Sequence, residues 1–106
     1  MKCIIVEAGG RLLYIERDKV EIILRQPVIW KVPEANKNIL GVLVYQNQLI
    51  AVYRLGKEED FPCGILIRTK GEELIGITAQ KTEGIEEMKT ESLEALMPGV
   101  WVKKLD

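Results

Sequence analysis

Short hydrophobic runs separated by turn residues make up most of this sequence, and they pair into three β-hairpins. The first pair of runs flanks Gly9-Gly10, which can adopt the positive φ angles that a two-residue hairpin turn needs. The second pair flanks Gln46-Asn47, where asparagine tolerates the left-handed conformation of such a turn. The third pair flanks a Lys-Gly-Glu turn at 70–72. The runs are residues 2–7 with 11–16, 39–45 with 48–55, and 65–69 with 73–79. Three hairpins in so short a chain predict an all-β fold.

The middle hairpin does not alternate between polar and apolar residues as a half-exposed hairpin does. Its runs ILGVLVY and LIAVY are apolar on both faces, which is typical of strands that are covered on two sides. We therefore expect a small sandwich or barrel in which this hairpin is shared between two packed layers. The third hairpin alternates better from Arg68 onward, and this pattern predicts a more peripheral position.

Helix is predicted at only two places. Residues 17–24 have apolar residues at helical spacing, but their β-branched content favours one helical turn that runs into a strand. Residues 90–97 carry an apolar stripe that predicts a short helix ended by Pro98-Gly99, followed by a last strand at 100–102. The sequence contains no repeat or linker, so residues 1–106 are expected to form a single domain.

Composition limits the classes of protein to which the chain can belong. The 106 residues are 47% hydrophobic, and Lys+Arg 15 against Asp+Glu 16 gives a net charge of −1. This is the composition of a globular chain, and it lacks the basic blocks that nucleic-acid binding requires. No apolar run approaches the ~20 residues that cross a bilayer. The N-terminal apolar stretch is too short for a secretory signal.

The missing residue types exclude much of common enzyme chemistry. The chain has no histidine and a single serine, Ser92, so catalytic triads and imidazole metal sites are excluded. Cys3 and Cys63 lie in apolar stretches far apart in the sequence; they are interpreted as buried small residues of a cytoplasmic protein, with a disulfide or a reactive thiol as the alternative. The acidic groups at 58–60 and 83–87 lack the spacing of a calcium loop and are expected to be solvated loops. We expect no cofactor, no metal and no catalysis.

The stretch from Gly10 to Ile85 resembles the CheW-like domain, the receptor–kinase coupling module of bacterial chemotaxis. The resemblance is strongest at Ile39-Leu40-Gly41-Val42, where the family has an apolar pair followed by Gly-Val. The other matching segments are Leu13-Tyr14-Ile15, Val20-Glu21-Ile22, Val32-Pro33, Ile65-Leu66-Ile67, Gly71 and Ile75-Gly76-Ile77. The resemblance implies two small SH3-like β-barrels packed on a common core, with one or two short helices and no enzymatic activity. It also implies a cytoplasmic adaptor whose partners are a histidine kinase regulatory domain and a chemoreceptor signalling tip.

The sequence departs from the family pattern at the hairpin tip, on the return strand and at the C-terminus. The family's Asn-Leu-Arg-Gly tip is replaced by Val44, Tyr45, Gln46 and Asn47, and glutamine cannot supply the charge of that arginine. The family's proline, its aspartate and a later acidic residue are replaced by Ala51, Arg54 and Gln80. The C-terminal region is shorter than in the family. This leaves open whether the second barrel is completed within the chain or by another chain.

The hairpin and its surroundings supply the candidate partner-binding residues, each with a structural alternative. The candidates are Gly41, Val42, Gln46, Asn47 and Arg54. Gly41 can instead mark a close approach of backbone, and Gln46-Asn47 can be a solvated turn. Trp30 and Trp101 are of a type enriched at interfaces, although tryptophan is as often a core or rim residue.

The predicted function is non-catalytic coupling by protein–protein contacts. The alternative is a divergent structural module that self-associates through an exposed strand edge and no longer couples receptors. A small-molecule sensor with a pocket between the barrels is the third hypothesis.

Overall fold

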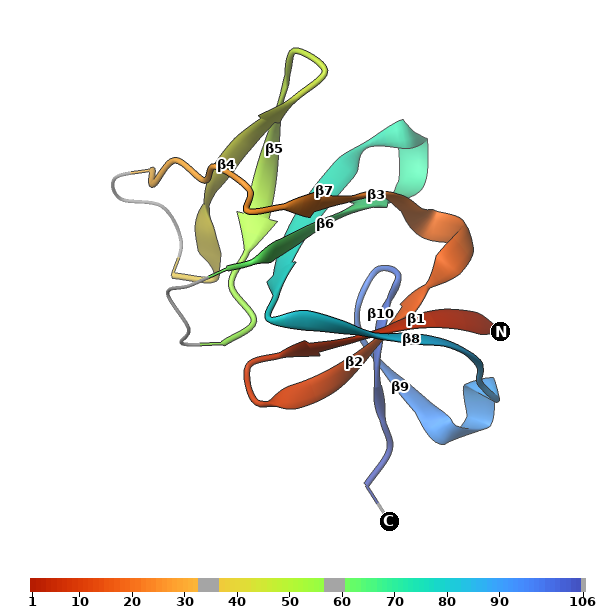
Figure 1. Ribbon diagram of the computed structural model, residues 1–106. Helices are drawn as coiled ribbons and strands as arrows, with labels where there is room; N and C mark the ends of the chain where they lie inside the picture. The colour runs from red at the N-terminus through yellow and green to blue at the C-terminus, as the bar shows by residue number, and fades with distance from the viewer. Residues whose placement is uncertain (33–36, 57–60, 106) are drawn as a thin grey trace.

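The computed structural model describes residues 1–32, 37–56 and 61–105, and within them the chain forms two five-stranded sheets (Figure 1). Pro33 and the acidic group at 58–60 lie outside the described residues. One sheet, here called the terminal barrel, has the order β8-β1-β2-β10-β9. Its strands are β1 (Lys2–Ala8), β2 (Arg11–Glu16), β8 (Lys81–Glu87), β9 (Leu93–Met97) and β10 (Val100–Lys103). The fold is all-β, as the sequence predicts.

The other sheet, here called the middle barrel, has the order β3-β6-β7-β5-β4. Its strands are β3 (Val20–Arg25), β4 (Ile39–Tyr45), β5 (Gln48–Tyr53), β6 (Cys63–Arg68) and β7 (Leu74–Ala79). All strand pairs in the two sheets are antiparallel except β5 with β7, which is parallel. The chain leaves the terminal barrel after β2 and returns to it at β8, so the middle barrel lies between two parts of the terminal barrel in the sequence.

The three predicted hairpins are confirmed as β1–β2, β4–β5 and β6–β7. The β4–β5 turn places Gln46 at φ 49° and Asn47 at φ 64°, so both central residues have the positive φ of a type I′ turn. Gly9 and Gly10 also have positive φ, at 63° and 77°.

The first helical expectation is confirmed and the second is wrong. A 3₁₀ turn at Arg17–Lys19 runs directly into β3, as predicted. Residues 90–97 form only a 3₁₀ turn at Thr90–Ser92 and then the strand β9, which pairs with β10. A helix of eight residues is marginal without tertiary support, and here the backbone hydrogen bonds are made to β10 instead. A third short turn occupies Lys70–Glu72.

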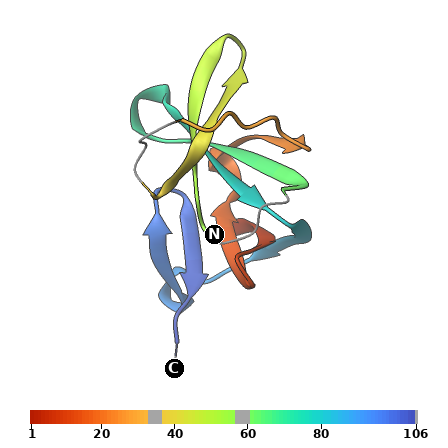
Figure 2. The same ribbon diagram turned by 90° about the vertical axis from the view of Figure 1, so that its left-hand side faces the viewer.

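Three hydrophobic clusters stabilise the fold, and one of them joins the two barrels. The common core lies between the sheets and contains side chains from both, including Val6, Leu13, Ile67 and Ile77. The middle barrel has its own interior cluster around Leu66. The terminal barrel has a smaller interior cluster, whose buried members are Cys3, Ile5, Tyr14 and Leu93. Figure 2 shows the two barrels one above the other, with the β9–β10 hairpin reaching up beside the lower ends of β4 and β5.

The β6–β7 hairpin contributes side chains to the common core and to the interior cluster of the middle barrel, so the expectation that it would be peripheral is wrong. The expectation that β4–β5 would be covered on both faces is also wrong. On β6, Ile65 and Ile67 enter the common core, whereas Leu66 enters the middle barrel, and all three are fully buried. On β4–β5, Val44 is 58% exposed and Leu49 is 74% exposed. The parallel pairing of β5 with β7 moves β4 to the edge of the sheet and β6–β7 to its centre. Such a non-local pairing leaves no trace in the local pattern.

Candidate partner-binding site

The five candidate residues are spread along the whole length of the β4–β5 hairpin and do not meet at one point. Gly41 and Val42 lie in the middle of β4, and Gln46 and Asn47 form the tip. Arg54 follows β5 at the opposite end of the hairpin, where its backbone N–H donates to the carbonyl of Asn38 at 2.8 Å. The hairpin therefore presents its tip away from the rest of the molecule and its base toward the terminal barrel (Figure 1).

Gly41 marks a close approach of neighbouring backbone. A Cβ atom at this position would overlap the carbonyl oxygen of Trp30 and would lie 2.9 Å from the Cγ2 atom of Ile29. The contact exists because Trp30 and Val42 exchange two backbone hydrogen bonds, of 2.8 and 2.9 Å, and so form an isolated bridge at the edge of β4. Any side chain at position 41 would therefore disrupt this bridge.

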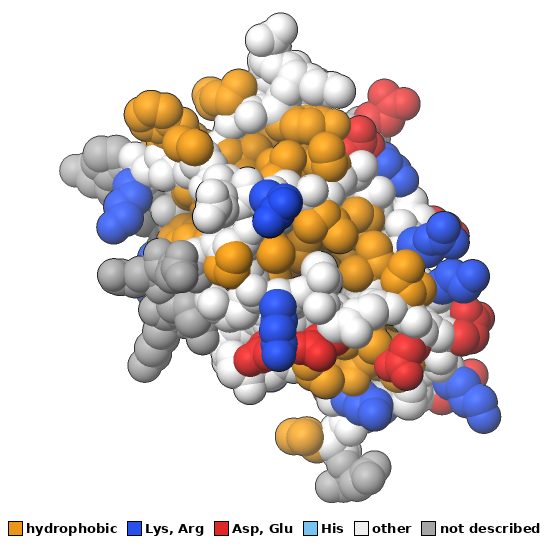
Figure 3. Space-filling view, in the orientation of Figure 1, with side chains coloured by type: hydrophobic (Ala, Val, Ile, Leu, Met, Phe, Trp, Pro, Cys, Tyr) orange, Lys and Arg blue, Asp and Glu red, His pale blue; other side chains and the backbone are white. Residues whose placement is uncertain are grey.

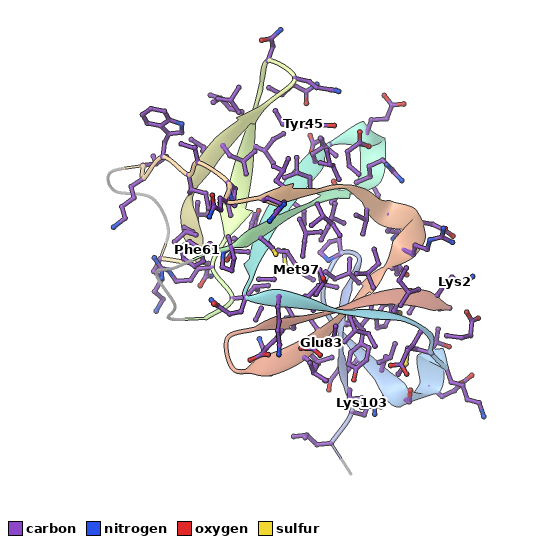
Figure 4. The ribbon with its side chains drawn as sticks, in the orientation of Figure 1. Lys2, Tyr45, Phe61, Glu83, Met97 and Lys103 are labelled. Carbon is purple, nitrogen blue, oxygen red and sulfur yellow. The ribbon has the colours of Figure 1, made fainter. Side chains whose placement is uncertain are left out.

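The base of the hairpin forms one wall of a groove between the two barrels, which we call the inter-barrel groove. Its volume is about 590 Å³, within the range of ligand-binding sites. The other wall comes from the end of the β9–β10 hairpin, and Met97 lies between the two sheets in Figure 4. The groove is lined by Arg11, Asn38, Tyr53, Arg54, Leu55, Thr69, Ile75, Leu96, Met97 and Pro98.

The inter-barrel groove combines an apolar floor with two cationic side chains. Arg11 and Arg54 are both exposed, and neither forms an ion pair with any residue in the described part of the chain. Leu96 is 38% exposed on the β9 side of the groove. An arginine guanidinium binds carboxylates through two parallel hydrogen bonds, so the groove suits an apolar segment that carries acidic groups.

The comparison with protein-family models assigns the chain. The model of the CheW-like domain matches residues 2–105. The chain belongs to the CheW-like domain family. No curated protein matches the sequence significantly.

Solved structures share the fold of this CheW-like domain. One of them is the scaffolding protein TtCheW from Thermoanaerobacter tengcongensis, which is similar with a TM-score of 0.71 at 17% sequence identity. The match covers 99% of this chain and 82% of that chain. The predicted pair of small barrels on a common core is therefore confirmed as the fold of this CheW-like domain.

Sequence reasoning found Arg54 but missed the residues that face it across the groove in this CheW-like domain. Leu96, Met97 and Pro98 were expected on and after a helix, where they would have packed as a buried stripe. The signal that could have found them is Pro98-Gly99 between two short apolar runs, which is also a hairpin turn signal.

The two tryptophans have opposite environments. Trp30 is 62% exposed at the edge of the middle barrel. Trp101 packs against the interior cluster of the terminal barrel. Only Trp30 is therefore placed as a surface residue that can contact a partner.

Both cysteines are free thiols, and the interpretation of them as buried residues is confirmed for Cys3 only. Cys3 is fully buried, and this burial raises the pKa of its thiol because the thiolate would lose its hydration. Cys63 is partly buried at the start of β6. A raised pKa disfavours the reactive thiolate, so Cys3 is inert at neutral pH.

The acidic group at 83–87 lies on the edge strand β8, not in a loop as expected. Every residue of β8 is exposed, and Figure 4 labels Glu83 at this barrel. Lys81 lies 3.2 Å from Glu83 and 3.7 Å from Glu7, and the hydrogen bond to Glu83 raises the pKa of its ammonium group. Cysteine and acidic side chains of the described residues form no cluster of three or more that could hold a metal ion. No helix within the described ranges has the length and hydropathy needed to cross a membrane.

Proposed function

We propose that this CheW-like domain is a non-catalytic adaptor of chemotaxis-type signal transduction, which couples chemoreceptors to a histidine kinase in the cytoplasm. The observation that carries the proposal is the family match over residues 2–105, which includes both barrels and the groove between them. The adaptor acts by binding, since its surfaces offer complementary shape and charge to other proteins.

The inter-barrel groove is the proposed docking site for the receptor tip. Receptor signalling tips are helical in the family, and an amphipathic helix binds by laying its apolar face into a hydrophobic groove. The apolar floor around Ile75 and Met97 would take that face, and Arg11 and Arg54 would pair with carboxylates beside it. Arg54 is thus the candidate residue with the most direct role in receptor binding.

The tip of the β4–β5 hairpin is proposed to contact the kinase regulatory domain. Gln46 and Asn47 are exposed and offer amide groups as hydrogen-bond donors and acceptors. Gln46 carries no charge, so this contact has less electrostatic steering than one made by arginine. Gly41 and Val42 act indirectly in this contact, because Gly41 leaves room for Trp30 and the backbone of Val42 holds Trp30 against β4.

Calorimetric titration with a chemoreceptor signalling-tip fragment and with a kinase regulatory domain tests the proposal. Arg54→Gln is expected to weaken binding of the receptor fragment about tenfold or more, because one charge-assisted hydrogen-bonding group is lost. Arg17→Gln is the matched control, since Arg17 is also exposed but lies on the 3₁₀ turn away from the groove lining. Failure of the unmodified chain to bind either partner at about 500 µM, a concentration at which even weak specific complexes form, would overturn the proposed function.

A further inference from the structure

The outer face of the β4–β5 hairpin is an uncovered apolar surface, which we call the open face. Leu43 on β4 and Ile50 on β5 are cross-strand partners, and their side chains point into the middle barrel and are buried. Because side chains alternate along a strand, their neighbours in sequence point the opposite way. The pairings Val44 with Leu49, Val42 with Ala51 and Trp30 with Val42 place these side chains on the outer side. Val28 lines the same surface hollow as Trp30 and Val44. The open face consists of Val28, Trp30, Val42, Val44, Leu49 and Ala51.

The amount of apolar surface on the open face is large for a small domain. Val28 is 69% exposed, Trp30 62%, Val44 58% and Leu49 74%. With typical areas for large side chains, these four residues expose roughly 450 Å², which is as large as the largest apolar patch of a typical monomer. On the side of the molecule that Figure 3 shows, hydrophobic side chains gather over the middle barrel, and charged side chains are more frequent over the terminal barrel.

The sequence of the hairpin also requires a second cover. Its two runs are apolar at successive positions, a pattern found in strands that are packed on both faces. The fold supplies one cover, the interior cluster of the middle barrel, and leaves the other face to solvent. The surface is therefore built for a contact outside the chain.

We propose that a second copy of this chain covers the open face, in a two-fold symmetric dimer whose β4–β5 sheets pack face to face. In such a dimer each patch contacts itself, so a charged patch would repel its own copy. The six side chains of the open face carry no charge, which removes this repulsion. Two copies would bury about 900 Å² from these side chains alone, which approaches the ~1,200 Å² at which specific dimers begin.

The strand edges are less suited to self-association than this face. The outer edge of β4 is occupied at Val42 by Trp30, which uses both backbone hydrogen-bonding groups there. The β8 edge carries Lys81, Glu83 and Glu86 among its exposed residues, and charged side chains oppose edge-to-edge pairing. Packing of sheet faces needs neither edge.

Sedimentation velocity of the full chain, from about 5 to 500 µM, tests the dimer. The unmodified chain should change from monomer to dimer within this range. The double variant Val44→Thr with Leu49→Thr should raise the dissociation constant at least about a hundredfold, since two hydroxyl groups per copy would be buried without partners. Threonine keeps the strand propensity of both positions, so the fold is retained.

Ile85→Thr is the matched control. Ile85 is 56% exposed on β8 in the terminal barrel, so the same chemical change is made on a surface outside the open face. This control should dimerise like the unmodified chain. The emission of Trp30 should shift to shorter wavelength as the dimer forms, because its exposed indole becomes buried.

Three results would overturn the proposal. One is a chain that stays monomeric at about 500 µM, which would assign the open face to a different protein. Another is a dimer that the double variant does not weaken. The third is growth into species larger than a dimer, since a two-fold interface closes on itself.

Discussion

Leu66 on β6 provides the most direct test of which hairpin is the centre of the fold. Its side chain is fully buried in the middle barrel, beside the common core to which its neighbour Ile67 belongs. Leu66→Ala removes three buried carbon atoms, worth about 2.4 kcal/mol of transfer free energy at ~0.8 kcal/mol each. The cavity left behind adds to this, so the free energy of unfolding should fall by about 3–4 kcal/mol. This is a large part of the ~5–15 kcal/mol that stabilises a typical domain.

Leu49→Ala is the matched control, because it makes the same chemical change on β5 at a position that is 74% exposed. Its cost should be only about 0.5 kcal/mol, since most of this side chain is already in water. Urea unfolding at a low micromolar concentration, where the chain is monomeric, measures both. Similar losses for Leu66→Ala and Leu49→Ala would show that β4–β5 is packed on both faces after all.

The same experiment measures whether the two barrels unfold together. Trp101 packs in the terminal barrel, whereas Leu66 lies in the middle barrel. In a Trp30→Phe background, the fluorescence of Trp101 should report the same shifted transition as circular dichroism, because the common core joins both sheets. A Trp101 transition that Leu66→Ala leaves unchanged would refute this coupling.

Further predictions concern the glycine under Trp30 and the two thiols. Gly41→Ala should lower the free energy of unfolding by about 2–3 kcal/mol, because the new methyl group overlaps the Trp30 carbonyl. Gly71→Ala, at φ 75° with open space around it, should lower it only by the ~1 kcal/mol of a left-handed alanine. Equal losses in urea unfolding would contradict the overlap at Gly41. The raised pKa of Cys3 means that the unfolded chain loses this thiol proton first. The contribution of Cys3 to the free energy of unfolding should therefore be constant at neutral pH and fall as the pH rises past the ordinary thiol pKa of 9.0; Cys3→Ala should flatten this decline, and an identical decline in the variant would refute the assignment. A thiol reagent at neutral pH should label Cys63 first and Cys3 only on unfolding, as mass spectrometry of labelled peptides would show.

The hairpins could be predicted from the sequence because their determinants are local. Gly9-Gly10 and Gln46-Asn47 fix the turns, and the flanking apolar runs fix the strands, so register and pairing follow within about twenty residues. The 3₁₀ turn before β3 was predictable for the same reason. The order of the hairpins in the sheet was not, because it depends on the parallel β5–β7 contact, which joins segments that are not neighbours in sequence.

The candidate site was predicted only in part, and the errors in its prediction have a common cause. Arg54 was named from its place in the hairpin, but the other wall of the groove depends on β9, where a helical periodicity was overridden by pairing with β10. The apolar outer face around Val44 was interpreted as buried, since a single sequence does not show whether the cover belongs to the same chain. The hydrophobic pattern of a strand indicates that its surface is covered, but it does not identify the segment or protein that covers it.

The arrangement of the terminal barrel has a consequence for biosynthesis. Its strands β1 and β2 are made first, but their partners β8 and β10 emerge from the ribosome only after the whole middle barrel has been translated. The strands of the middle barrel, β3 to β7, follow one another in the sequence, so this barrel can fold first. Until β8 and β10 are available, the side chains of Val6 and Leu13 remain exposed to solvent. Pairing of β1 with β8 and of β2 with β10 joins segments that are far apart in the sequence, and such non-local contacts form slowly because a long loop must be closed. This last folding step should therefore limit the rate of folding.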